Sequence, residues 1–166
     1  MTAAAANPSY KVVVVGHSLG GAIAAIAATE LRNAGTSTDL YTYGQPRIGG
    51  LIVSNYVTNQ NLGGNFRVTH LDDPVPRLPP LILGFVHISP EYYINTGNNV
   101  VVTAGDITKH SGPVNIFGNT GNIGNGADIA VSHLSQSFSI RRHSKLRVEV
   151  LVAKASHLSI LSRISG

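Results

Sequence analysis

A run of valines followed by a glycine-framed serine constrains the fold of this chain more than any other stretch. Residues 12–15 are four consecutive valines, apolar on both faces, as a central strand of a parallel sheet must be. Residues 16–20 read Gly-His-Ser-Leu-Gly and fit the pattern G-x-S-x-G, in which a serine lies on a sharp strand-to-helix turn. The two glycines are required because side chains at their positions would collide across so tight a turn.

A helix is predicted directly after this turn. Residues 21–33 are rich in alanine, and Gly35 is suited to end the helix. The amino-terminus of such a helix carries partial positive charge toward Ser18, and the backbone N–H of Leu19 can then donate to an oxyanion. A tight turn with an incidental serine is the alternative. Because strand, turn and helix are all present, we predict that Ser18 is a nucleophile.

Strand and helix patterns alternate along the next forty residues. Residues 39–44 and 65–71 are predicted strands, and residues 51–61 are a weaker helix candidate because they contain Val, Asn and Thr. Strand, helix, strand, helix, strand is the order of βαβ units, so we expect an α/β fold with a mostly parallel sheet.

The region after the third predicted strand has few regular signals. Residues 72–80 hold four prolines and should form a rigid loop at the carboxyl end of that strand, where open α/β sheets place their sites. The runs 84–89 and 99–103 flank residues 90–94 and look like an antiparallel hairpin at the sheet edge. Residues 105–128, rich in Gly and Asn, are expected to be an extended loop.

A nucleophilic serine requires a base, and the base requires a carboxylate that holds its tautomer. In α/β-hydrolase sites the chain order is Ser, then Asp or Glu, then His. Asp39 precedes a predicted strand and so lies at the wrong edge of the sheet. Asp72 and Asp73 both follow the third strand at the correct edge, and alternation alone does not choose between them.

Among the histidines that follow the aspartates, His133 is a good candidate for the base. His87 lies in a strand-like run, where a packed, hydrogen-bonded histidine is expected. His133 lies where the long loop meets a short ordered segment, a suitable position for reaching over the sheet edge. His70 with Asp72 and Asp73 is weak evidence for a metal site, because the three lack a regular helical spacing. We therefore expect no metal site.

Composition excludes several classes of protein. The chain has 166 residues, of which 43% are hydrophobic and 12% charged, which is typical of a globular domain. It has no cysteines and no apolar run near the ~18 residues of a membrane span. Its first nine residues lack the basic segment and long apolar core of a signal peptide.

The positive charge of the chain is concentrated at its carboxyl-terminal end. The formal net charge is +4, but residues 1–140 carry −1 and residues 141–166 carry +5. Since the body is nearly neutral and has no basic stripe interleaved with aromatic residues, we expect no nucleic-acid partner. An amphipathic helix on a membrane surface is a minor alternative for the basic segment.

Four motifs in order carry a family resemblance. They are residues 16–21 (GHSLGG), 43–49 (YGQPRIG), 68–80 (VTHLDDPVPRLPP) and 87–93 (HISPEYY). Together they resemble the fungal class 3 lipases, which are secreted triacylglycerol lipases with feruloyl esterases as close relatives. The resemblance runs from about residue 10 to about residue 138.

The resemblance implies an α/β-hydrolase-type fold and a Ser-His-Asp triad. The catalytic aspartate of the family stands just before the segment x-Val-Pro-Arg, which here identifies Asp73, and its histidine precedes Leu in a late segment, which supports His133. The implied function is hydrolysis of lipid esters at a lipid–water interface by a secreted enzyme without a cofactor. Ser18 would attack the ester, and the Leu19 N–H would hold the oxyanion.

The chain also departs from the family pattern. Family members carry a segment before the elbow strand with the lid and the second oxyanion donor, so we interpret residues 1–138 as the carboxyl-terminal half of the domain. Residues 139–166 resemble no part of the family and are interpreted as a basic tail. We therefore expect a poor catalyst whose central strand has an unpaired edge and which requires the missing amino-terminal half.

Two other functions stay open at this stage. The first is an esterase for soluble aromatic esters of the feruloyl type, because chain-length preference depends on the lid and the acyl groove. The second, from a different class, is a truncated product without catalytic activity. The residues alone do not indicate an oligomeric state.

Overall fold

The computed structural model describes residues 7, 9–122 and 148–154, the last of these as backbone only. The strands are β1 (Tyr10–His17), β2 (Thr38–Tyr43), β3 (Asn65–His70), β4 (Glu91–Ile94), β5 (Ile107–His110) and β6 (Val148–Lys154). The helices are α2 (Leu19–Asn33) and α3 (Leu51–Thr58), with short 3-10 turns η1 (Val75–Arg77), η2 (Leu81–Leu83) and η3 (Ala104–Asp106).

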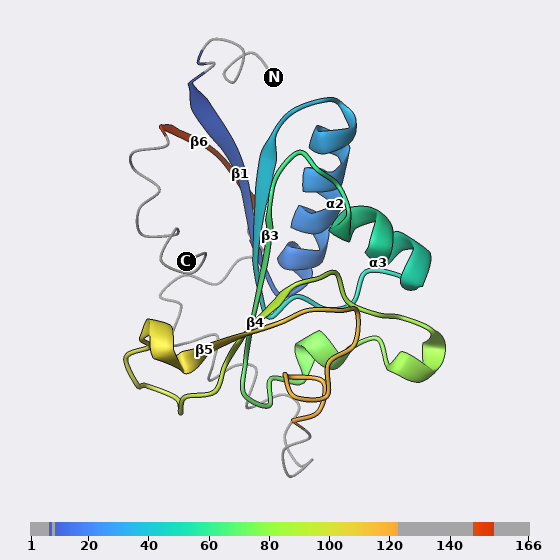
Figure 1. Ribbon diagram of the computed structural model, residues 1–166, viewed down its shortest axis with the longest axis vertical. Coiled ribbons are helices and arrows are strands. Elements are labelled where there is room, and N and C mark those ends of the chain that lie inside the picture. The colour runs from blue at the N-terminus through green and yellow to red at the C-terminus, as the bar shows by residue number, and fades with distance from the viewer. Residues whose placement is uncertain (1–6, 8, 123–147, 155–166) are drawn as a thin grey trace.

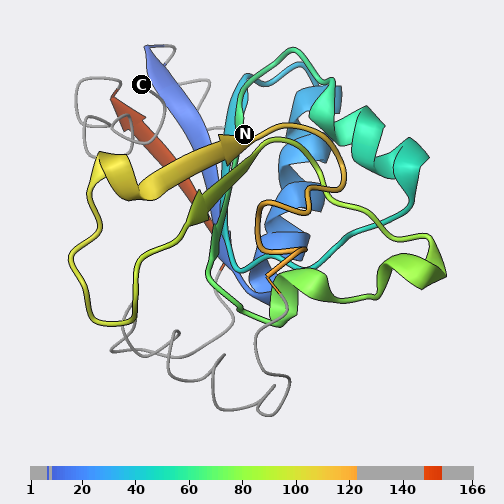
Figure 2. The same cartoon turned by 60° about the horizontal axis from the view of Figure 1, so that its bottom comes forward.

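The strands form one sheet in the order β5-β4-β3-β2-β1-β6. Strands β1 to β4 are mutually parallel, while β5 and β6 pair antiparallel with β4 and β1. Figures 1 and 2 show α2 and α3 on the same side of this sheet. The mostly parallel α/β sheet predicted from the sequence is confirmed by this strand order and pairing.

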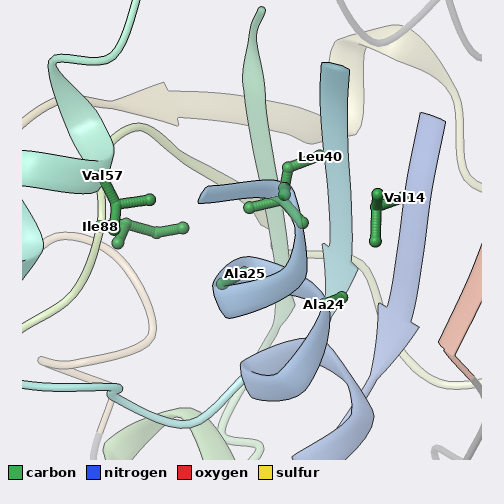
Figure 3. Packing of buried hydrophobic residues seen from close by; sticks show 7 residues of the cluster. Val14, Ala24, Ala25, Leu40, Val57 and Ile88 are labelled. Atoms are coloured by element: carbon green, nitrogen blue, oxygen red, sulfur yellow. The ribbon is translucent and has the colours of Figure 1, made fainter. Parts of the chain in front are cut away.

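The core lies between the sheet and α2. Val14 of β1 and Leu40 of β2 are completely buried and pack against Ala24 and Ala25 of α2 (Figure 3). Because α2 presents alanines and glycines to the sheet, its backbone can approach the strands closely. Within the described part of the chain, no helix is long and apolar enough to cross a membrane.

The edge of the sheet differs from its prediction. The strands are Glu91–Ile94 and Ile107–His110, whereas residues 84–89 and 99–103 are not strands and residues 105–128 are not entirely loop. The valine run was misleading because its side chains are solvent-exposed, with Val101 85% exposed. Strand β4 was obscured because it begins with Glu91, a charged residue that finds a buried partner in β3.

The expected unpaired edge of β1 is also wrong. Strand β6 pairs antiparallel with β1 over the seven residue pairs from Tyr10↔Lys154 to Gly16↔Val148. A segment interpreted as a tail thus contributes a strand to the sheet, since its backbone N–H and C=O groups pair with those at the edge of β1. The predicted boundary between residues 138 and 139 lies outside the described residues and stays a prediction.

Candidate active site

Ser18 occupies a strained turn between β1 and α2. Its backbone has φ 56° and ψ −131°, a conformation that non-glycine residues rarely adopt. The Ser18 N–H donates to the carbonyl oxygen of Tyr43 at 2.8 Å, which ties the turn to the end of β2. Strain of this kind concentrates at functional sites, where the surrounding structure holds it in place.

Gly16 allows the turn to close. A Cβ at Gly16 would overlap the carbonyl group of Gly20 and would lie 2.8 Å from the Cβ of Ala24. The strand therefore crosses the first turn of the helix with no room for a side chain. This observation confirms the steric reason predicted for the first glycine of the motif.

The amino-terminus of α2 begins immediately after the serine. Leu19 is the first residue of the helix, and the N–H groups of a first helical turn lack acceptors within the helix. The side chain of Ser18 does not cap these groups. The turn therefore combines a partly exposed serine, partial positive charge and backbone donors, which is an arrangement suited to a developing oxyanion.

Asp73 follows the carboxyl end of β3, and its side chain lies beside Gly44, the residue that follows β2. Its side chain is buried, with 5% exposed, and its Oδ1 accepts a hydrogen bond from the Val75 N–H at 3.0 Å. A Cβ built on Gly44 would lie 2.9 Å from Asp73 Oδ2 and 3.8 Å from His17 Nε2. Gly44 directly follows Tyr43, whose carbonyl oxygen holds the Ser18 N–H. The serine turn and the Asp73 carboxylate therefore both contact the segment Tyr43–Gly44.

Asp72 differs from its neighbour in burial. It is only partly buried, whereas Asp73 is buried. The carbonyl oxygen of Asp72 accepts a hydrogen bond from Arg77 Nη2, which stabilises the loop. The difference in burial separates two carboxylates that the residue pattern could not separate.

The histidines have separate environments. His133 lies outside the described residues. The expectation of a packed, hydrogen-bonded His87 is confirmed, although His87 lies in a loop: its Nε2 donates to the Pro76 carbonyl at 2.6 Å. Burial, with help from Arg67 and Arg47, holds the pKa of His87 well below its usual value, so the ring is neutral. Among the residues that the structure describes, no three acids and histidines are grouped to hold a metal ion.

A buried charged pair that was not predicted from the sequence lies beside residues 71–80, the loop that carries Asp73 and is here called the aspartate loop. Arg67 Nη1 of β3 lies 3.5 Å from Glu91 Oε1 of β4, and both side chains are almost completely buried. Glu91 Oε1 also accepts a hydrogen bond from Thr69 at 2.7 Å. Burial lowers the pKa of Arg67 to about 10, opposed by Glu91, so the guanidinium stays charged near neutral pH.

Arg47 holds the far end of the aspartate loop. Its Nη1 donates to the carbonyl oxygens of Arg77 and Pro79, the latter at 2.7 Å, and its backbone N–H donates to Leu78 at 2.7 Å. In the sequence, the available signal for this cluster was that two arginines and one glutamate stand within strand and loop segments of a chain that is only 12% charged. The structure shows that all three are buried. A charge inside a strand or loop that must be buried implies a partner.

Comparisons with known proteins agree on one family. The class 3 lipase family matches residues 2–83. Secreted mono- and diacylglycerol lipase A of Penicillium cyclopium is 52% identical over 118 residues, which are 70% of this chain and 38% of the relative. The chain therefore spans well under half the length of that protein.

Solved structures agree with this result. The mono- and diacylglycerol lipase of Aspergillus oryzae matches 80% of this chain and 48% of its own, with a TM-score of 0.72 and 45% identity. A structure described as "a serine protease triad forms the catalytic centre of a triacylglycerol lipase" matches 58% of this chain and 38% of its own. Its TM-score is 0.54 and its identity 44%.

Proposed function

This chain is a relative of the fungal class 3 lipases, as its motifs predicted, and on that premise we propose that it is a serine carboxyl-ester hydrolase acting on lipid esters. The observation that carries the proposal is the strained Ser18 turn, which meets the buried carboxylate of Asp73 at Gly44. A glycine-framed serine without such a carboxylate nearby would be weak evidence.

The proposed reaction has two halves. Ser18 Oγ attacks the ester carbonyl while His133 takes its proton, and the same histidine returns the proton to the departing alcohol. Water then attacks the acyl-enzyme, again with His133 as base, and the carboxylic acid leaves. Asp73 orients the histidine and stabilises its charged form, while the Leu19 N–H donates to the oxyanion in both halves.

Three observations support these assignments. Asp73 is buried, unlike Asp72, and its carboxylate accepts a hydrogen bond, so its charge acts in a medium where electrostatic interactions are strong. The related triacylglycerol lipase is described as having a serine protease triad. The assignment of His133 rests on the sequence motif.

The substrate class follows from the relatives. The Penicillium relative is named a secreted mono- and diacylglycerol lipase, so we propose partial acylglycerols and related lipid esters as substrates and an extracellular site of action. We also propose that the activity of the 166-residue chain is low. An oxyanion hole of this type takes its second donor from a loop upstream of the elbow, and losing one donor costs about 10²–10³ in turnover.

Labelling of the nucleophile tests the proposal directly. A fluorophosphonate should label the 166-residue chain at Ser18, the Ser18→Ala variant should not be labelled, and the matched control Ser9→Ala should be labelled normally. Ser9 is an exposed serine in the turn before β1. Labelling that persists in Ser18→Ala would contradict the assignment. Absence of labelling in the wild-type chain would leave the non-catalytic alternative.

A comparison of ester substrates tests the proposed substrate class. A comparison of short-chain and long-chain 4-nitrophenyl esters with feruloyl esters, using the chain joined to the upstream part of a related lipase, should favour the acyl esters. Preference for the feruloyl ester would identify the aromatic esterase instead. An increase in turnover of the joined form over the 166-residue chain would support the assignment of the second oxyanion donor upstream.

A further inference from the structure

Asn119 is a buried side chain that connects a distant segment to the aspartate loop. It is 1% exposed and lies 46 residues after Asp73 in the chain. Its Nδ2 donates two hydrogen bonds, to the carbonyl oxygen of Leu71 at 3.0 Å and to that of Asp73 at 2.8 Å. Both protons of one amide are thus used on the turn that carries the carboxylate.

The turn that Asn119 holds is strained. Leu71 has φ 39°, in the left-handed region that a leucine rarely adopts, and it lies two residues before Asp73. A residue in this region costs roughly 1–3 kcal/mol and stays there only when its surroundings hold it. The backbone N–H groups of the turn are already used, from Leu71 to Ile94 and from Asp73 to His70. Asn119 supplies donors to two of its carbonyls, so the turn is held from both sides.

The segment that carries Asn119 is itself fixed in place. A Cβ on Gly118 would overlap the Glu91 carboxylate, so the backbone lies directly against that buried group. The backbone N–H of Asn119 lies 3.4 Å from Glu91 Oε1. Three residues later, the carbonyl oxygen of Asn122 accepts a hydrogen bond from Arg77 of the aspartate loop at 2.8 Å. The amide of Asn119 is therefore a rigid support for the turn.

We propose that Asn119 is a positioning residue that holds the backbone of Asp73, and through it the direction of the Asp73 carboxylate toward the catalytic base. This inference rests on the proposed function, because it requires Asp73 to act on a histidine. A carboxylate displaced by about 1 Å orients the imidazole poorly, and misplacement of that size costs about 10²-fold in rate.

A carboxylate in the correct place has a second effect that can be measured. It raises the pKa of the neighbouring imidazole because it favours the charged form of the ring. The acidic limb of the pH–rate profile reports that pKa. Displacing the carboxylate lowers the pKa of the base, so the limb should move to lower pH.

The experiment measures the rate of Ser18 labelling by a fluorophosphonate against pH in the 166-residue chain. Asn119→Leu, which keeps the volume but removes both donors, should slow labelling about 10- to 100-fold and move the acidic limb to lower pH by about half a unit. Asn119→Ala, a second variant that also removes both donors and adds no charge, should act in the same direction. The matched control is Asn122→Ala, whose side chain donates to the hydroxyl of Tyr93 and not to the loop; it should keep the limb unchanged.

The Asp73→Asn background separates positioning from general support of the fold. If Asn119 acts through the carboxylate, Asn119→Leu should cost little further rate and should not move the limb in that background, because coupled residues are non-additive. Equal losses in both backgrounds, a loss of rate without a shifted limb, or variants that do not fold would each overturn the proposal. Failure of the wild-type chain to be labelled would instead contradict the proposed function, so the two failures are distinguishable.

Discussion

The serine turn and the aspartate loop meet at Gly44, but they are built in different ways. The serine turn consists of consecutive residues: a buried strand, Gly16, Ser18 and the first turn of α2. The aspartate loop is held by side chains from elsewhere in the chain, with Arg47 at one end and Asn119 at the other. A local motif can thus form one half of a site, while the other half requires the completed sheet.

The largest effect should come from neutralising the loop carboxylate. In a form of the chain joined to the upstream part of a related lipase, Asp73→Asn should lower turnover about 10⁴-fold, the scale observed when a triad carboxylate is neutralised. Asp72→Asn, the matched control with a partly exposed side chain, should cost far less. The measurement is kcat on a short-chain ester. Equal losses in the two variants would mean that the acid is misassigned.

The buried ion pair should have the next largest effect, on the stability of the aspartate side of the molecule. Glu91→Gln leaves the Arg67 guanidinium buried without a counter-charge, which should lower the free energy of unfolding by about 3–5 kcal/mol. Replacing both partners, in Arg67→Met with Glu91→Leu, should recover much of that loss. Glu30→Gln, a change at an exposed glutamate of α2, is the control and should alter stability by less than about 0.5 kcal/mol. Urea denaturation measures all of these, and a fully stable Glu91→Gln would contradict the role of the pair.

The serine turn should be destabilised by added side-chain volume. In Gly16→Ala the added methyl group meets the backbone of Gly20 as well as Ala24, so the strand and helix must move apart. We expect a loss of about 1–3 kcal/mol, as for overpacked sites, together with slower labelling of Ser18. Gly35→Ala changes a glycine at the other end of α2, where no atom lies within 4 Å, and provides a comparison for the strain of positive φ alone. Normal labelling of Gly16→Ala would show that the turn tolerates a side chain.

The smallest effect should be a dependence of folding stability on pH that is caused by His87, which is hydrogen-bonded to the aspartate loop. Since the pKa of His87 is well below 6.5 in the folded chain, the unfolded chain binds an extra proton as the pH falls below 6.5. Stability is therefore complete above pH 6.5 and falls below it, by at most about 1.4 kcal/mol per pH unit from this group. His87→Gln keeps a donor for Pro76 and should flatten this part of the curve. An unchanged slope between pH 6.5 and 5 would mean that other groups cause it.

The elements predicted correctly from the sequence are those built from consecutive residues, and the elements missed are those that depend on distant partners. Strands β1, β2 and β3 and helix α2 were predicted close to their observed ends, because valine runs, alanine-rich stretches and glycine stops act over a few residues. The edge strands β4 and β5 and the pairing of β6 with β1 were missed. Each depends on a partner far away in the chain, as when Glu91 enters a strand because Arg67 lies on the next one.

The sequence by itself determined the serine turn: its glycines, its strand and its helix are encoded within residues 10–33, where steric limits and local hydrogen bonds leave few other conformations. It also narrowed the acid to two neighbours, between which the family motif favoured Asp73. Only the tertiary structure decided that Asp73 is the buried one, and that Asn119 and Arg47 hold the loop that carries it. The physical reason is that burial and long-range hydrogen bonds exist only after distant strands have paired, so no short stretch of sequence encodes them.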